Sequence, residues 1–354
     1  MKTYLSVWQQ ENLISQEDVR LKIIQAGSLA PSSHNTQPWE FKLLSNKNTF
    51  EIYISRSRYT PEVDPDYRQT WISLGAWFGY ASISALQFGY TLSAVWHEDW
   101  ASSPNRMDSP IGLLKIQSTT QIDHPLYPYL FHPDTNRSPH KKHSIPHPLI
   151  DLIQSFNKTD VRVQTITDRH LIDNLSSLAY QAAILETTQL PIMKETTLLF
   201  RKNEREKNLY GYGFSIDSNP VTPISLWFTQ TLLTVFPRLS STESASRVFL
   251  SNMRKSLSHT EAILCMSVPV MTMKKCIEIG QVYAQIVCLG HSYGVACHPI
   301  SQAIEVYDAM LETKLNIEHL LNIQGELMML VRVGFPTKST RPSIRQPIEK
   351  LIRK

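Results

Sequence analysis

The stretch LAPSSHNTQPWEF, residues 29–41, carries the first information about the fold and the function of this chain. Within thirteen positions it places two prolines, two serines, an asparagine, a glutamine and a tryptophan. Short polar side chains let the backbone approach a ligand, and they offer donors and acceptors to its polar edges. A turn that only ends a helix is the alternative, and we favour the binding loop because the string is long and varied.

The residues before this loop predict a helix. Apolar side chains recur at helical spacing through residues 16–30, and Ser15 with Asp18 has the pattern of a capping box. Pro31 cannot continue a helix, so we expect the helix to end there.

After the loop, the first part of the chain has the pattern of a mixed α and β unit. Alternating apolar runs on both sides of residues 46–48 predict a hairpin. A long apolar helix from Arg68 to Phe88 follows, with Gly89 as its C-terminal cap. Two strands come next, of which the second is GLLKIQST at 112–119. We therefore expect a first unit over residues 1–125.

The pattern restarts after a loop-like region at 120–148 that is dense in histidine and proline. The expected elements are a helix from Pro148, a strand at 161–167, a helix at 169–186, a buried strand at 262–270, a helix at 276–294 and a strand from Val295. Residues 190–260 are expected to be mostly helical, with the turn YGYGF at 210–214 as a possible part of a lid. The second unit spans 126–354.

A repeat relates the two units. Gly75 to Gly89 and Gly280 to Gly294 both span fourteen residues, and each pair brackets an apolar helix that ends in an aromatic residue and glycine before a strand. Chance is the alternative, because helix, glycine and strand often follow one another. The second half lacks the polar loop, since its expected counterpart at 179–193 reads AYQAAILETTQLPIM. We predict a pseudo-dimer within one chain that keeps a single site.

The composition of the chain argues against several classes of protein. The chain has 354 residues, of which 42% are hydrophobic and 19% charged, and a net charge of +4 that is spread along it, which argues against nucleic-acid binding. It contains neither a signal peptide nor a run of about 20 apolar residues, so we expect a cytoplasmic protein that is not in a membrane. The cysteines lack C-x-x-C spacing and predict buried, reduced thiols; they are Cys265, Cys276, Cys288 and Cys297.

Four histidines lie close together in sequence, at His132, His140, His143 and His147. Only the last two have the spacing of metal ligands on a helix, and the prolines around them disfavour a helix there. We expect no metal site.

The string APSSHNTQPWEF resembles the flavin-contacting loop of the nitroreductase family, A-P-S-x-x-N-x-Q-P-W. The matching residues are Ala30, Pro31, Ser32, Asn35, Gln37, Pro38 and Trp39. The resemblance implies an α+β, nitroreductase-like fold in which two protomers interlock and FMN lies at their interface. One protomer would supply this loop and the other the rest of the site.

Three later stretches look like the Acg-type branch, in which two such halves are fused into one chain. They are DTNRSPH at 134–140, HPISQAIEV at 298–306, and LMMLVRVGF at 327–335 followed by RPSIRQPIEKLI at 341–352. The resemblance implies that the first holds the FMN phosphate and ribityl chain, that backbone amides of the second face flavin N5, and that Arg345 lies on the phosphate side. The implied cofactor-binding residues are Pro31, Ser32, Ser33, Asn35, Gln37, Thr135, Asn136, Arg137, Ser138, Pro299, Ile300, Ser301, Gln302 and Arg345.

Each of these cofactor-binding assignments has an alternative, and the sequence also departs from the pattern of the family. The loop residues could be turn formers, Arg137 and Arg345 could be solvated, and the turn at 299–301 could simply end a strand. Pro133 stands where relatives carry an arginine, and Ser138 and His140 replace an arginine and a phenylalanine. One phosphate contact is expected to be lost, so FMN could bind more weakly or another ligand could be preferred.

The function implied by the resemblance is that of an FMN-dependent oxidoreductase. NAD(P)H would reduce the flavin, and an electron-poor small molecule would then reoxidise it. No dedicated acid or base is required; His34 could donate a proton, but we expect it to pack or to face solvent. The alternatives are a flavin-storing protein whose lid prevents turnover, and a flavin-free descendant that acts on another nucleotide or as an interaction protein. We expect a monomeric pseudo-dimer or a weak homodimer.

Overall fold

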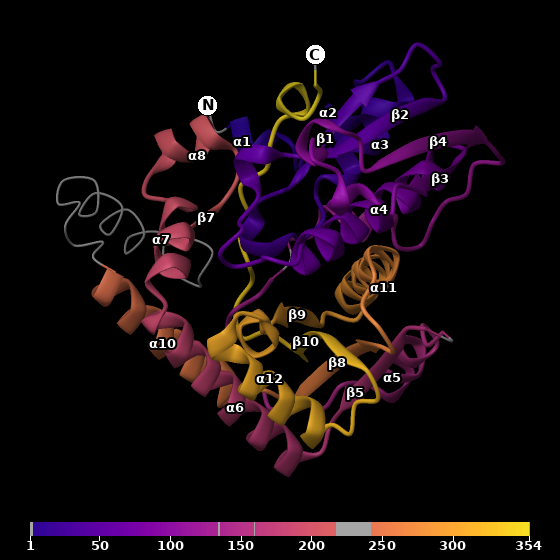
Figure 1. The fold of residues 1–354 in the computed structure, drawn as a ribbon. Coiled ribbons are helices and arrows are strands. Elements are labelled where there is room, and N and C mark those ends of the chain that lie inside the picture. Colours follow the sequence, from indigo (N-terminus) through magenta and orange to yellow (C-terminus); the bar gives the residue numbers. More distant parts are fainter. Residues whose placement is uncertain (1–2, 134, 159, 217–241, 354) are drawn as a thin grey trace.

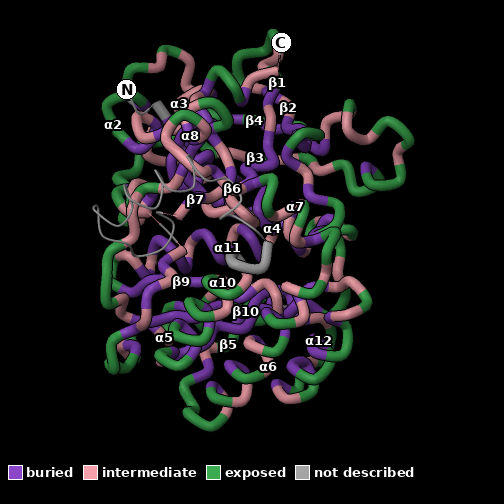
Figure 2. Tube along the Cα trace, turned by 90° about the vertical axis from the view of Figure 1, so that its left-hand side faces the viewer, coloured by how far each residue is buried: buried purple, intermediate pink, exposed green. Residues whose placement is uncertain are grey.

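The computed structural model describes residues 3–133, 135–158, 160–216 and 242–353. Two four-stranded antiparallel sheets lie on opposite sides of two long helices, α4 and α11, which pack against each other in the middle of the molecule (Figure 1). Buried backbone follows this middle region and the sheets, and exposed backbone lies on the outer helices and loops (Figure 2). The observed architecture is therefore mixed α and β, as predicted.

The first sheet has the strand order β1-β2-β4-β3. Its elements, in chain order, are α1 Thr3–Ser6, α2 Gln10–Ile14, α3 Val19–Gly27, β1 Trp39–Leu43, β2 Thr49–Ile54, α4 Arg68–Gln87, β3 Tyr90–Trp96 and β4 Gly112–Ser118. The hairpin, the long helix and both following strands are confirmed. Gly89, directly after α4, has a positive φ of 77° and permits the change of direction into β3.

The predicted helix at 16–30 is shorter than expected at both ends. Asp18, not Ser15, caps it, because the Asp18 carboxylate accepts a hydrogen bond from the backbone N–H of Arg20. Ser15 instead follows the end of α2. The helix ends at Gly27, four residues before Pro31, so the proline does not itself stop it.

The second sheet has the order β5-β8-β10-β9. Its elements are α5 His147–Gln154, β5 Arg162–Ile166, α6 Arg169–Thr188, α7 Leu190–Leu198, β6 Phe200–Arg201, α8 Glu204–Tyr210, β7 Phe214–Ser215, α10 Thr242–Leu257, β8 Ala262–Val268, α11 Met273–Ser292, β9 Ala296–Pro299, α12 Asp308–Leu320 and β10 Glu326–Gly334. The predicted helices and strands are present, whereas α12 was not predicted. Part of the predicted helical region, residues 217–241, lies outside the described residues.

Both sheets place their strands in the order first, second, fourth, third, and in both a 20-residue helix joins the second strand to the third. The halves differ between their first two strands. Residues 44–48 make this connection in the first half, and residues 167–261 make it in the second. The counterpart of the polar loop is thus the short connection 155–161 between α5 and β5. The expected counterpart at 179–193 is wrong, because those residues lie in α6 and α7.

The two long helices touch through their backbones. A Cβ atom built on Gly75 would lie 2.0 Å from the carbonyl oxygen of Ile277, and one built on Gly280 would lie 2.0 Å from that of Ile72. Each glycine therefore contacts the residue that lies three positions before the other glycine. Such reciprocal contacts are those of a two-fold interface, and they support the similarity of the halves. Origin by fusion stays a prediction.

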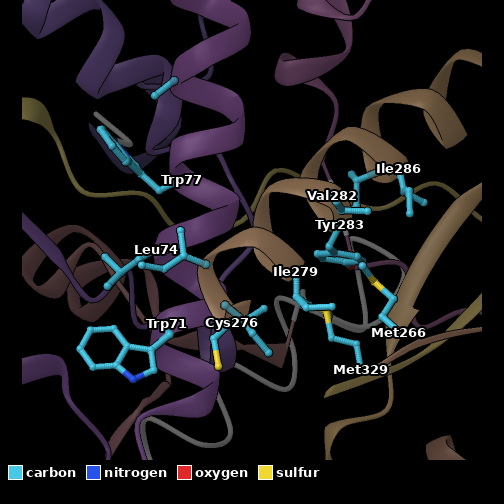
Figure 3. Close-up of a cluster of buried hydrophobic side chains, with 14 of the residues drawn as sticks. Trp71, Leu74, Trp77, Met266, Cys276, Ile279, Val282, Tyr283, Ile286 and Met329 are labelled. Carbon is cyan, nitrogen blue, oxygen red and sulfur yellow. The ribbon is translucent and has the colours of Figure 1, made fainter. Parts of the chain in front are cut away.

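Side chains from both helices fill the space around this crossing (Figure 3). Trp77 of α4 is completely buried and packs against Phe41 of β1, with ring centroids 4.7 Å apart. Tyr283 of α11 lies beside Met266 of β8 and Met329 of β10. All four cysteines are buried, as predicted. The crossing thus joins the cores of both halves.

The second half also lends backbone to the first. The C-terminal segment 336–353, which we call the strap, crosses to the first sheet, where Phe41 N–H donates to Leu351 O (2.8 Å) and Arg353 N–H donates to Phe41 O (2.7 Å) (Figure 1). Within the second half, Lys141 N–H, in the connection after β4, donates to Phe335 O (2.7 Å). No described helix has the length and apolarity needed to cross a membrane.

We predict that Gly280→Ala lowers the free energy of unfolding by about 1–3 kcal/mol. The added methyl group would meet the Ile72 carbonyl and the Ala76 nitrogen, and neither backbone atom can move without separating the helices. Urea denaturation would measure the loss. Gly290→Ala, in the same helix, is the matched control, because its nearest neighbour lies 3.1 Å away. Equal effects of the two substitutions would contradict the importance of the crossing.

Candidate functional site

The polar loop has a strained backbone. His34, Asn35 and Gln37 have φ values of 47°, 54° and 49°, in the left-handed region that residues other than glycine rarely adopt. Each such residue costs about 1–3 kcal/mol, so the surrounding structure must hold the loop in place. Strain of this kind is concentrated at binding and active sites.

The strap holds the loop from one side. Arg345 is 2% exposed, and its guanidinium donates to the side-chain oxygen of Asn35 and to the backbone carbonyls of Leu29 (2.9 Å) and Ala30 (3.2 Å). It also lies over the ring of Trp8, 4.9 Å from the centroid. Arg345 therefore stabilises the loop, and its role toward a phosphate stays a prediction.

An arm from the second half holds the loop from the other side. We use this name for residues 189–215, which comprise α7, β6, α8 and β7 and rise alongside the first half (Figure 1). The Asn35 amide donates to Gly213 O and Ile344 O, both at 2.8 Å. The Gln37 amide donates to Gly211 O (3.0 Å) and accepts from the backbone N–H of Gln346 (2.9 Å). The sequence YGYGF thus lies directly on the loop.

These contacts assign Asn35 and Gln37 a role that the sequence did not predict. In both side chains, the N–H groups of the amide donate hydrogen bonds to backbone carbonyls, and the amide oxygen accepts a hydrogen bond from the strap. The two residues therefore fasten the arm and the strap to the loop. Ser32 supports the same turn by accepting from the backbone N–H of Gln37 (3.0 Å), and Pro31 precedes it half-buried.

Of the two environments expected for His34, packing against the protein is the one observed. Its ring lies beside Phe214 of the arm, with centroids 6.2 Å apart, and its buried Nε2 has no hydrogen-bond partner among the residues that the structure describes. Burial, together with the smaller effect of the charge of Arg137, lowers the pKa of His34 to about 4. The imidazole is therefore neutral at pH 7, and Arg137 lies close enough to influence it.

Asn136 fixes the segment that carries Arg137. Its backbone N–H donates to Cys297 O of β9 (3.0 Å), and its side-chain amide donates to Lys338 O of the strap (2.8 Å). Its side-chain oxygen accepts from the N–H of Ser138 (2.9 Å). The Ser138 side chain is fully buried, and its Oγ has no hydrogen-bond partner in the described part of the chain.

Arg137 lies between the loop and β9. Its carbonyl accepts a hydrogen bond from Ser256 Oγ (2.6 Å), and its charge contributes to lowering the pKa of His298 as well as that of His34. Burial is the larger cause for both histidines. Thr135, just before this segment, has a φ of 63°, so the strained backbone of the loop recurs here.

One predicted residue is corrected at the turn after β9. The Ile300 side chain is fully buried in the core, and its N–H donates to Leu330 O (2.7 Å), so this amide is not available to a flavin. Pro299 ends β9, and Ser301 and Gln302 begin the 3-10 helix η8, Ser301–Ile304. Ser301 and Gln302 therefore remain the candidates for cofactor contact on this turn.

Helix α4 connects the loop to this turn. Ser33 N–H donates to Ser73 Oγ (3.0 Å), and Ser33 Oγ donates to the side-chain oxygen of Gln69. The Gln69 side chain in turn approaches the carboxyl group of Glu305, directly after η8. Residues far apart in the sequence thus meet in one region.

Sequence reasoning missed three members of this region: Gln69, Glu305 and Glu186, which approaches Gln302. Glu305 lies within HPISQAIEV and could have been noticed there. Nothing in the sequence marks Gln69 or Glu186, because only tertiary packing brings α4 and α6 to the turn.

No curated protein matches this chain. Among solved structures, the FMN-dependent nitroreductase NfnB from Mycobacterium smegmatis in complex with NADPH is 13% identical, with coverage of 62% of this chain and 94% of that chain and a TM-score of 0.37. A BluB-like flavoprotein from Clostridium difficile 630 is 11% identical, with coverages of 65% and 98% and a TM-score of 0.38.

The model of the nitroreductase family matches residues 10–91. This range contains the polar loop, the hairpin and α4. The segment of the chain that carries the strained loop is therefore the segment that matches the nitroreductase family.

Proposed function

We propose that this protein is an FMN-binding oxidoreductase of the nitroreductase type. The observation that carries the proposal is the meeting of the strained loop with Arg137 and the Ser301–Gln302 turn, because a ligand placed there would touch both halves. The family match over residues 10–91 supports the choice of a flavin. We further propose that residues 1–125 and 126–354 form the two halves and that one chain makes one complete site.

The residues present fit an anionic, polar ligand. The Oγ of Ser138 and the Nε2 of His34 are buried polar atoms without a hydrogen-bond partner among described residues, and such atoms are normally satisfied. Arg137 adds a positive charge that suits a phosphate. In this proposal Arg137 and Ser138 bind the phosphate, and Ser33, His34, Ser301 and Gln302 contact the ring system.

Bound FMN would supply the redox chemistry, accepting a hydride from NAD(P)H and reducing an electron-poor acceptor such as a nitroaromatic compound or a quinone. The residues of the chain itself would position the cofactor and enclose it. Ser33 donates its N–H to Ser73 and its hydroxyl hydrogen to Gln69, so its hydroxyl oxygen is held in place as an acceptor before a ligand binds. The arm excludes water from the loop side of the site.

A second candidate function is storage of flavin without turnover. It is favoured by the hydrogen bonds of Asn35 and Gln37 to Gly213 and Gly211, because these hold the arm on the loop. An arm that stays closed would prevent NAD(P)H from reaching the ring.

We predict that the purified protein shows the visible absorption bands of oxidised flavin. Under anaerobic conditions, NADPH or NADH should bleach these bands within seconds if the protein is an oxidoreductase. Bands that persist with NAD(P)H and disappear with dithionite would establish storage instead. A colourless protein that does not bind added FMN would refute both functions.

We expect Arg137→Gln to weaken FMN binding roughly tenfold to hundredfold, because a charged hydrogen bond contributes about 1.5–3 kcal/mol. Riboflavin, which lacks the phosphate, should bind the variant and the wild type equally. Fluorescence titration measures both affinities, and Lys142→Gln, on an exposed part of the same connection, is the control. A similar loss for riboflavin would show that Arg137 acts on the fold and not on a phosphate.

The arm can be loosened without altering the loop. Tyr4 Oη–H donates to Glu204 of the arm (2.8 Å), and Glu195 of the arm accepts from the N–H groups of Glu62 (3.1 Å) and Val63 (2.9 Å). The double variant Tyr4→Phe/Glu195→Gln should speed flavin reduction by NADPH about fivefold, which corresponds to about 1 kcal/mol less closure.

Stopped-flow reduction kinetics would test this prediction. Asp108→Asn is the control, because Asp108 forms an exposed ion pair with Arg56, away from the arm. An unchanged rate in the double variant, with NADPH still able to reduce the flavin, would show that the arm does not limit access.

A further inference from the structure

Two carboxyl groups are buried together beside the Ser301–Gln302 turn. Glu305 follows η8 and is 3% exposed, and Glu186, near the end of α6, is 4% exposed. Glu186 belongs to the long insertion between β5 and β8, which has no counterpart in the first half. The insertion therefore brings a second acid to a turn that already carries one.

The groups that face the pair do not neutralise it. Tyr307 approaches Glu305 from the same connection, and Asp64 approaches from the start of α4. The Asp64 carboxylate is occupied by the N–H groups of Gln69 (2.9 Å) and Thr70 (2.8 Å). The nearby cation on α4, Arg68, is paired with Glu326 (3.1 Å) and with Asp66 (3.5 Å).

Glu305 lines a small cavity. Its volume is about 20 Å³, enough for about one water molecule, and Asp64, Gln69 and Met328 also line it. Neither carboxyl oxygen of Glu305 has a hydrogen bond of standard geometry to a described residue. A buried carboxylate without donors is far more costly than a buried carboxyl group that is protonated.

The pKa values of the two carboxyl groups agree with this geometry. Burial raises the pKa of Glu305 to about 7, and it raises the pKa of Glu186 well above its usual value. The neighbouring carboxyl group of Glu305 raises the pKa of Glu186 further. Two carboxyl groups that repel each other in this way titrate as a unit.

The pair is connected to both sides of the proposed flavin site. On one side, Glu305 is reached through Gln69, whose side-chain oxygen accepts from Ser33 Oγ of the loop. On the other side, Gln302 approaches Glu186. Asp64 is a third buried acid beside Glu305, and its carboxylate already accepts hydrogen bonds from the backbone N–H groups of Gln69 and Thr70.

We propose that Glu186 and Glu305 share one proton and supply it, through water in the cavity that Glu305 and Gln69 line, to the acceptor side of the site. This role rests on the proposed function. Reduction of a quinone by NAD(P)H consumes one hydride and one proton; the hydride comes from NAD(P)H, the proton leaves the pair, and water restores it.

The shared proton can be tested without flavin. Infrared spectroscopy of the apoprotein should show a carboxylic-acid C=O band at pH 7 that is absent from Glu186→Gln/Glu305→Gln. In Glu186→Gln alone, the midpoint of this band should fall by about one pH unit or more, because the repulsion is removed. Glu312→Gln, at an exposed position of α12, is the control. Wild-type spectra in all variants would overturn the proposal.

Thermal unfolding gives a second readout with a defined sign. Because folding raises both pKa values, the protonated pair stabilises the folded state in acid, and this contribution is lost as the pH rises through about 7. The Tm of the wild type should therefore fall relative to the double glutamine variant between pH 5 and pH 8. A constant difference in Tm would contradict the shared proton.

The role in turnover is tested by the pH profile of acceptor reduction. Glu305→Gln should lower kcat about tenfold and remove its decline above pH 7, with KM for NAD(P)H unchanged. An unchanged profile in a variant that has lost the infrared band would refute proton supply. A protein that binds no FMN would refute the proposed function and this role together, and the infrared result would still decide whether the proton is shared.

Discussion

The backbone contact between Gly75 of α4 and Gly280 of α11 determines how the two halves are placed. A carbonyl group lies where a Cβ atom of either residue would be, so only glycine permits this approach. Each helix carries its own sheet, and the crossing therefore fixes the distance between the sheets. It also brings Gln69, on the first turns of α4, to the turn after β9 in the other half.

Two segments of the second half reinforce this placement and create the asymmetry of the molecule. The strap runs to the first half, where Arg345 and the backbone of Gln346 hold the strained loop. The arm belongs to the long connection between β5 and β8, whose counterpart in the first half is the short turn between β1 and β2. The first half thus supplies the loop, and the second supplies the strap and the arm that hold it.

Two kinds of buried polar group result from this arrangement. Asn35 and Gln37 are fully hydrogen-bonded within the chain, and they stabilise a backbone that would otherwise be strained. His34, Ser138 and Glu305 keep polar atoms without partners among the described residues. Because unsatisfied buried groups are costly, His34 and Ser138, which the position of Arg137 relates to each other, support a ligand site more strongly than the satisfied amides of the loop do.

Most of the secondary structure, the similarity of the long helices and the family resemblance of the loop could be predicted from the sequence, because periodicity, glycine spacing and short strings are local properties; α12 was missed. Only the tertiary structure decided which residues meet. Arg345 holds the loop, a role that the sequence did not predict, Ile300 packs in the core although it was predicted to contact the cofactor, and nothing in the sequence marked Glu186. These outcomes depend on contacts between residues that are distant in the sequence, which the order of the amino acids does not display.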